Sequence, residues 1–179
     1  GMISKASGSD SIAIGVRSDD RGAQGNQSIA IGYLAGAISD YGTALGASAE
    51  ANEYSTALGT STTASSTYST AIGNNANASN TDAVAIGSRG VTASGESSVA
   101  IGSKADAAIT TASGSGSIAI GDGAVSTGDW SVALGTMTEA KGLNTVAIGN
   151  YAEAKGNNNI AIGNHACKNI ITLCFSIIS

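Results

Sequence analysis

Apolar and polar positions alternate in short segments along most of this chain. A typical segment is Val146-Ala147-Ile148-Gly149, in which a β-branched residue, an alanine and an Ile or Leu come directly before a glycine. β-branched residues favour extended backbone, and successive side chains of a strand point to opposite faces. The pattern therefore predicts short β-strands with the large side chains on one face and alanine on the other. The high glycine content and the period of two argue against helices.

The segment recurs with a regular period. Ala-[Ile/Leu]-Gly occurs eleven times, and six of the ten intervals between successive glycines are 14 residues. A fixed period of this kind indicates a repeat architecture. In the eight repeats whose β-branched residue is Ile or Val, the predicted repeat positions are Ile12, Ile14, Gly15, Ile29, Ile31, Gly32, Val84, Ile86, Gly87, Val99, Ile101, Gly102, Ile118, Ile120, Gly121, Val132, Leu134, Gly135, Val146, Ile148, Gly149, Ile160, Ile162 and Gly163.

Each repeat contains a second, weaker strand of small residues, such as Ala152-Glu153-Ala154-Lys155. Two strands this short are not stable alone, but stacked repeats give each strand parallel neighbours on both sides. We therefore predict an all-β solenoid of about eleven coils, with a rise of ~4.8 Å per coil and a length of roughly 50 Å. Two intervals are longer than the rest, and we expect loops to protrude within residues 16–28 and 103–117.

The alternation does not by itself say which face of the strand is inside. We expect the Val/Ile column to fill the interior of the coil and the invariant alanines to face outward, where another copy of the chain approaches closely. Such an association would supply the apolar burial that a thin coil lacks. Periodicity does not choose between two chains and three. The alanines predicted at this interface are Ala13, Ala30, Ala44, Ala57, Ala71, Ala85, Ala100, Ala119, Ala133, Ala147 and Ala161.

Composition and charge exclude several classes of partner. The net charge is −5, and the eight Lys and Arg residues are scattered rather than clustered. We therefore expect no nucleic-acid partner and no membrane insertion. Three regions are predicted: a leader or tag remnant at 1–8, head repeats at 9–166 and an apolar tail at 167–179 that holds Cys167 and Cys174. The first residues contain no apolar segment typical of a secretion signal.

The sequence contains no convincing set of catalytic or metal-binding residues. His165 is the only histidine, and no serine or threonine has a recognisable base, so we predict neither an enzyme nor a cofactor or metal site. An acyltransferase of the hexapeptide type would need a period of six. Calcium binding at Asp19 and Asp20 would lack the usual nonapeptide signature. We expect Asp19, Asp20, Tyr33 and Trp130 to be the candidate ligand contacts.

The motifs Ser28-Ile29-Ala30-Ile31-Gly32 and Ser98-Val99-Ala100-Ile101-Gly102 resemble the YadA-like heads of trimeric autotransporter adhesins, over about residues 9–166. The resemblance implies a left-handed parallel β-roll, a homotrimer, and a place at the tip of a bacterial surface fibre that attaches to extracellular protein or glycan ligands on host matrix or cells. The neck, stalk and anchor of that family are not in this sequence. We therefore expect either a fragment of a longer fibre or a reuse of the module, for example in a phage tail fibre of a virion.

Overall fold

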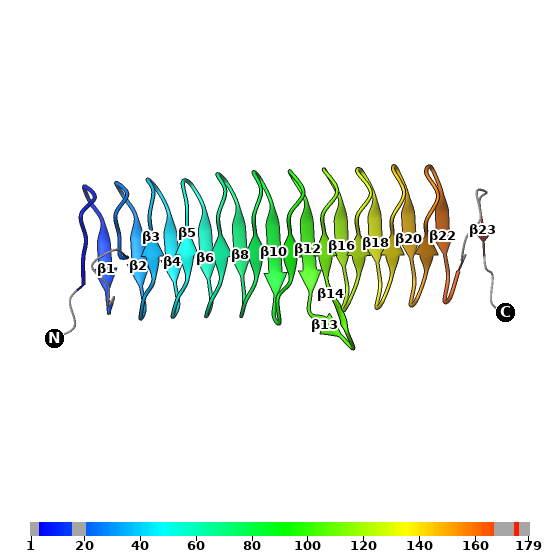
Figure 1. Cartoon of the computed structure of the whole chain (residues 1–179), viewed down its shortest axis with the longest axis horizontal. Coiled ribbons are helices and arrows are strands. Elements are labelled where there is room, and N and C mark those ends of the chain that lie inside the picture. Colours follow the sequence, from blue (N-terminus) through cyan, green and yellow to red (C-terminus); the bar gives the residue numbers. More distant parts are fainter. Residues whose placement is uncertain (1–3, 16–20, 167–173, 176–179) are drawn as a thin grey trace.

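The chain forms a parallel β-solenoid of about ten turns (Figure 1). The structure, a computed structural model, describes residues 4–15, 21–166 and 174–175. Within these ranges every regular element is a strand and there is no helix. It follows that no helix of the described part is long and apolar enough to cross a membrane. The predicted all-β solenoid is confirmed.

The first sheet runs along one side of the solenoid and contains one strand from each repeat. All its neighbours are parallel and in register, so that Val84 pairs with Val99, Ala85 with Ala100 and Ile86 with Ile101. Its strands, in order, are β1 (Ile12–Ile14), β2 (Ile29–Ile31), β4 (Thr43–Leu45), β6 (Thr56–Leu58), β8 (Thr70–Ile72), β10 (Val84–Gly87), β12 (Val99–Gly102), β16 (Ile118–Ile120), β18 (Val132–Leu134), β20 (Val146–Ile148), β22 (Ile160–Ile162) and β23 (Cys174–Phe175).

The second sheet lies on the other side of the coil and is built from two-residue strands. Thr63 pairs with Asn77 and Ala64 with Ala78, again in parallel register. Its strands, in spatial order from the N-terminal end, are β3 (Gly36–Ala37), β5 (Glu50–Ala51), β7 (Thr63–Ala64), β9 (Asn77–Ala78), β11 (Thr92–Ala93), β15 (Thr111–Ala112), β17 (Val125–Ser126), β19 (Glu139–Ala140) and β21 (Glu153–Ala154). Each repeat thus makes one full circuit, and equivalent residues form columns along the rod.

One coil carries a small hairpin that projects from the rod. Its strands, β13 (Lys104–Ala105) and β14 (Ala108–Ile109), are antiparallel and form a separate two-stranded sheet (Figure 1). The hairpin lies within the long interval at 103–117, where the sequence predicts a protruding loop. The other predicted loop includes residues 16–20, which lie outside the described residues. The boundaries proposed at residues 8 and 166 stay predictions.

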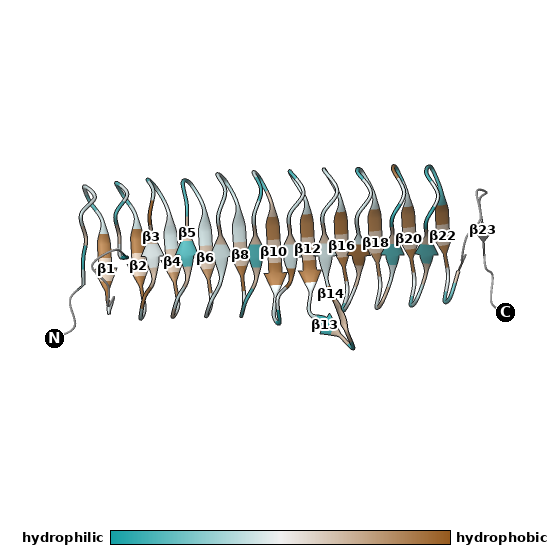
Figure 2. Cartoon of the chain, in the orientation of Figure 1, coloured by the Kyte–Doolittle hydropathy of each residue, from teal (hydrophilic) through white to brown (hydrophobic). Residues whose placement is uncertain are grey.

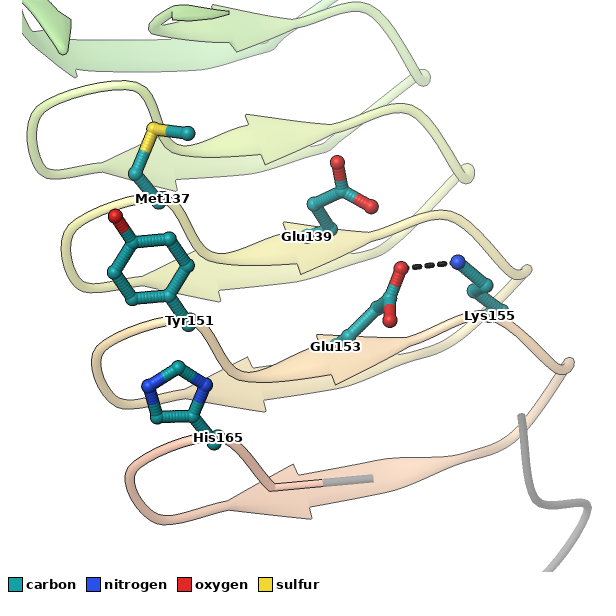
Figure 3. Close-up of a pocket in the computed structure, with 6 residues that line it drawn as sticks. All are labelled: Met137, Glu139, Tyr151, Glu153, Lys155 and His165. Carbon is teal, nitrogen blue, oxygen red and sulfur yellow. Dashed lines mark ion pairs between the residues drawn. The ribbon is translucent and has the colours of Figure 1, made fainter. Parts of the chain in front are cut away.

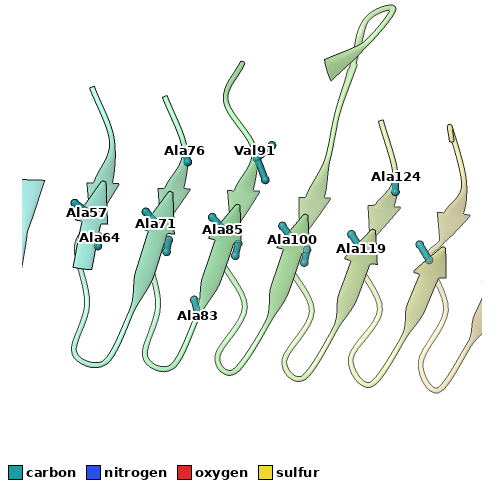
Figure 4. Close-up of a cluster of buried hydrophobic side chains, with 14 of the residues drawn as sticks. Ala57, Ala64, Ala71, Ala76, Ala83, Ala85, Val91, Ala100, Ala119 and Ala124 are labelled. Carbon is teal, nitrogen blue, oxygen red and sulfur yellow. The ribbon is translucent and has the colours of Figure 1, made fainter. Parts of the chain in front are cut away.

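The buried hydrophobic residues of the coil are almost all alanine (Figure 4), and buried serines and threonines accompany them. Ala57 and Ala71 of the first sheet and Ala64 and Ala78 of the second are fully buried. Facing sheets usually pack about 10 Å apart around large side chains. The side chains inside this coil are far smaller than that: most are alanine, and the rest are chiefly buried serines and threonines such as Ser126 and Thr62. Val91 is the largest fully buried side chain among the described residues.

This arrangement corrects the predicted orientation of the first sheet. The alanines expected to face another chain point into the coil instead, and the Val/Ile column expected inside points outward. Ten of these alanines are fully buried, and Ala13 is partly buried. The residues concerned are Ala13, Ala30, Ala44, Ala57, Ala71, Ala85, Ala100, Ala119, Ala133, Ala147 and Ala161. The alternation was predicted correctly, but its inner face was assigned wrongly, because a coil filled mainly by alanine has no room for a whole column of isoleucine and valine side chains.

The repeated glycine forms the corner after each strand of the first sheet. Gly73, for example, has φ +121°, and a Cβ built on it would lie 1.6 Å from the carbonyl oxygen of Gly87 in the next coil. Glycine is therefore required both by its left-handed backbone and by the close approach of successive coils. At the opposite corner, buried hydroxyl groups donate hydrogen bonds to main-chain carbonyl groups. Ser28 Oγ donates to the Gly25 carbonyl at 2.6 Å, and Thr145 Oγ1 donates to the Gly142 carbonyl at 2.8 Å.

Candidate binding surfaces

The outer face of the first sheet is apolar over almost its whole length. We call the outward side chains of β1 through β22 of this sheet the apolar stripe; in Figure 2 most of these strands are brown, and β4, β6 and β8 are paler. Leu45, Leu58 and Ile162 in this stripe are each about 40% exposed. Threonine replaces the β-branched apolar residue only at Thr43, Thr56 and Thr70. A continuous apolar surface of this size is unusual on a soluble monomer.

The outer face of the second sheet is mostly polar, with Val125 as its one large apolar side chain among the described strands. Short polar side chains such as Thr63 and Asn77 occupy its middle, and ion pairs lie toward its ends. Arg21 pairs with Glu50 at 3.2 Å, Lys141 pairs with Glu139 at 2.7 Å, and Lys155 pairs with Glu153. Exposed pairs of this kind contribute about 0–1 kcal/mol each. This face therefore behaves as a solvated surface, in contrast to the apolar stripe on the other side of the coil.

The Glu153 carboxyl is the most enclosed of these charges. Partial burial acts to raise its pKa, but the hydrogen bond from Lys155 and the nearby Lys141 charge outweigh burial and hold the pKa of Glu153 below its usual value. The same hydrogen bond raises the pKa of Lys155. Both groups are therefore charged at neutral pH, and neither is adapted to act as a general acid or base.

A shallow groove lies beside this ion pair at the C-terminal end of the described repeats (Figure 3). The rings of Tyr151 and His165 form one side of it and stack parallel, with centroids 5.0 Å apart. The groove has a volume of about 470 Å³ and is lined by Met137, Glu139, Tyr151, Glu153, Lys155 and His165. None of these six described lining residues is a serine, threonine or cysteine. In the part of the chain that the structure describes, no three His, Cys, Asp or Glu side chains are grouped to hold a metal ion.

Three tyrosines form a ladder along one edge of the rod. The ring centroids of Tyr41 and Tyr54 are 4.6 Å apart, and those of Tyr54 and Tyr68 are 5.2 Å apart. All three residues have positive φ, near +50° to +60°. Desolvation raises the pKa of Tyr54, and the neighbouring Tyr41, Tyr68, Glu53 and Asp40 add to the rise. The ladder was missed in the sequence, although each tyrosine comes five residues before a repeat glycine.

The predicted ligand contacts do not form a common site. Tyr33 is 47% exposed and follows the repeat glycine Gly32, whereas Trp130 is 64% exposed and precedes β18 at the opposite corner of its coil. The two side chains therefore lie on different edges and several coils apart. Asp19 and Asp20 lie outside the described residues.

The repeat motif, its 14-residue circuit and the parallel register are together characteristic of one known family. The model of the YadA head domain repeat matches seven segments that extend over most of the chain. The chain belongs to the YadA head family. The matched segments are 3–18, 23–50, 51–76, 64–89, 92–108, 112–136 and 140–166. Comparison with curated proteins found no match. YadA heads are structural, adhesin-type modules rather than typical enzymes, in agreement with the repetitive fold.

Proposed function

We propose that this YadA head is a non-enzymatic attachment module that works as a homotrimer at a bacterial surface, with the apolar stripe of each chain facing the threefold axis. The observation that carries the proposal is the apolar stripe itself. The coil already buries its own alanines, whereas the outward Ile, Leu and Val side chains of the described repeats stay partly exposed, as at Leu45 and Leu58. Burying a half-exposed side chain of this size contributes about 1 kcal/mol.

Three features support this arrangement over a different interface. The opposite face is polar and carries paired charges, so it is suited to remain in solvent. The apolar stripe follows the axis of the rod, because its residues are in register from coil to coil. The choice of three chains rather than two, and the extracellular location, come from the resemblance to the family. A symmetric interface of this kind also brings identical columns together, as closed oligomers require.

Attachment would occur through the surfaces that the trimer leaves exposed, namely the second sheet and the edges of the coils. Three copies on one stiff rod give avidity even when each contact is weak. We expect these surfaces to bind protein or glycan ligands of host matrix or cells.

Sedimentation equilibrium tests the assembly directly. The expected mass is three times the 17.3 kDa of one chain. A monomer at micromolar concentration would overturn the assembly, and a dimer would overturn the threefold arrangement. Attachment is tested by coating beads with the trimer and measuring their retention on matrix proteins and on cultured cells. Retention no greater than that of uncoated beads on every surface would overturn the adhesive function.

A further inference from the structure

Trp130 lies flat against the main chain of the preceding coil. Of the exposed large apolar side chains in the described part of the chain, Trp130 is the most exposed, at 64%. A Cβ built on Gly116 would lie 2.5 Å from Cε3 and from Cζ3 of its indole, and 3.3 Å from Cδ2. The indole therefore covers the position that a side chain at residue 116 would occupy. One face of the ring is held by the protein, and the high exposure means that the other is open.

This arrangement depends on a single glycine in a column of side chains. The position five residues before each repeat glycine always has a left-handed backbone, and elsewhere it carries a side chain. Its occupants are Asp10, Gln27, Tyr41, Tyr54, Tyr68, Asp82, Ser97, Gly116, Trp130, Asn144 and Asn158. In the tyrosine ladder the rings cover one another's faces. Only at Trp130 does the preceding coil have a glycine, Gly116, at this position, so that the ring can pack over the main chain.

Polar residues flank Trp130 in the sequence and at the same position of the next coil, and hydrogen bonds hold them in place. Asp129 Oδ1 accepts a hydrogen bond of 2.8 Å from the Ser115 amide, and the Trp130 amide donates to the Ser115 carbonyl at 2.8 Å. In the following coil the Asn144 amide donates to the Asp129 carbonyl at 2.9 Å. The Asn144 side chain is exposed and donates to Asn158 Oδ1 at 3.4 Å. The main chain around the ring is thus held from both neighbouring coils.

We propose that the open face of Trp130, together with Asp129 and Asn144, is a binding site for a neutral pyranose ring of a glycan. The face of an aromatic ring is electron-rich and attracts the weakly positive C–H groups on one side of a sugar. Carboxylate and amide groups beside it accept and donate hydrogen bonds to sugar hydroxyls. The Asp129 charge and the net charge of −5 disfavour sulfated or sialylated chains. The inference deepens the proposed attachment function and rests on it for its biological context.

The chain contains a single tryptophan, so its fluorescence reports on this site alone. The trimer is titrated with lactose and with triacetylchitotriose as neutral probes, and with a heparin oligosaccharide as an anionic probe. We expect a saturable fluorescence change with at least one neutral probe and none with heparin. If neither neutral probe changes the fluorescence and an array of neutral glycans captures no trimer, the proposal is wrong. A response to heparin alone would also overturn it.

Two variants separate the site from the fold. Asn144 and Asn158 already adopt φ near +55° at the corner where Gly116 has φ +61°, so Gly116→Asn is compatible with the backbone. Its Cβ would push the indole away, and we expect binding to the responsive probe to weaken about tenfold. Trp130→Ala should weaken array binding at least as much. Tyr68→Ala, an exposed aromatic on the same edge, is the matched control and should leave binding unchanged. Full binding by Trp130→Ala would overturn the proposal.

Enzymatic removal of glycans from the matrix and cell surfaces distinguishes the glycan site from the proposed attachment function. If untreated surfaces retain the beads and deglycosylated ones do not, both proposals stand, and the Trp130→Ala trimer should lose the glycan-dependent part. If attachment is insensitive to deglycosylation and to Trp130→Ala, the adhesive function stands and the glycan site is wrong. If attachment needs Trp130 but not glycans, the indole is a protein contact and the proposal fails. If the probes bind but no surface retains the beads, the glycan site stands alone.

Discussion

The rings of Tyr41 and Tyr54 lie 4.6 Å apart and within 8° of parallel, although the residues belong to different coils. Tyr68 continues the stack at 5.2 Å from Tyr54. Because coils contact mainly their neighbours, a side chain that touches the coils on both sides joins three repeats. Tyr54 is such a residue.

Tyr54→Ala should lower the free energy of unfolding by about 1–2 kcal/mol, because two stacked pairs are lost. Chemical denaturation followed by circular dichroism measures this change. Tyr33→Ala is the control: Tyr33 is similarly exposed, and no ring among the described residues stacks on it. Equal losses in the two variants would show that stacking contributes nothing.

Enlarging the interior should be far more harmful than enlarging the surface. Ala100→Leu places a branched side chain in an interior packed with small side chains, and we expect a loss of about 3 kcal/mol or complete unfolding. Ala107→Leu, at the exposed tip of the β13–β14 hairpin, should change stability by less than about 0.5 kcal/mol. Thermal unfolding of both variants makes the comparison. Native stability in Ala100→Leu would contradict the inward orientation of the alanines.

The glycine corner gives a second test of coil spacing. Gly73→Ala would bring a Cβ to 1.6 Å from the Gly87 carbonyl oxygen, so we expect a loss of about 3 kcal/mol or more. Gly36→Ala is the matched control, since its nearest neighbour would lie at an ordinary 3.5 Å. The yield of soluble protein and the denaturation midpoint report both effects. Similar midpoints for the two variants would refute the close approach.

A charge in the apolar stripe should separate the chains without unfolding them. Val132→Asp places a carboxylate on the outer face of β18, where the proposed interface would bury it unpaired. We expect monomers in sedimentation experiments and a largely retained β spectrum. Thr127→Asp on the exposed opposite side is the control and should leave the mass unchanged. If Val132→Asp also keeps the wild-type mass, the interface lies elsewhere.

Acid should weaken the end of the rod where Glu153 pairs with Lys155. The folded state lowers the pKa of Glu153 below 4.5, so its contribution to stability is present above that pH and is lost as the pH falls through the folded value. The difference in melting temperature between wild type and Glu153→Gln should therefore be largest near neutral pH and vanish in strong acid. A difference that is the same at pH 3 and pH 7 would exclude the ion pair as its source. Added salt should also reduce it.

Most of the fold could be predicted because the repeat encodes it locally. The β-branched column, the alternation and the glycine corners follow from spacing alone, and all eleven repeat glycines have positive φ. The inner face could not be predicted in this way. The alternation of Val99, Ala100 and Ile101 is compatible with either orientation, and the choice depends on the distance between two sheets that are remote in sequence.

The binding surfaces were less accessible to sequence reasoning. Trp130 was proposed as a ligand contact, and that stays a prediction. The packing of its ring over Gly116 could not be foreseen, because it depends on how the coil of Trp130 stacks on the one before it. The tyrosine ladder carried a signal, namely a shared position in successive repeats. The Tyr151–His165 stack could have been recognised by the same signal, since each of these residues follows a repeat glycine by two positions.

The β13–β14 hairpin adds residues to one corner while the strands on both sides keep their pairing, with Ala100 still opposite Ala119. The shaft thus tolerates extra sequence at this corner without a shift in register. Residues 106 and 107 at its tip are consequently a natural place to graft a foreign epitope or binding peptide. In evolution, the same position allows new recognition segments to be acquired while the framework remains unchanged.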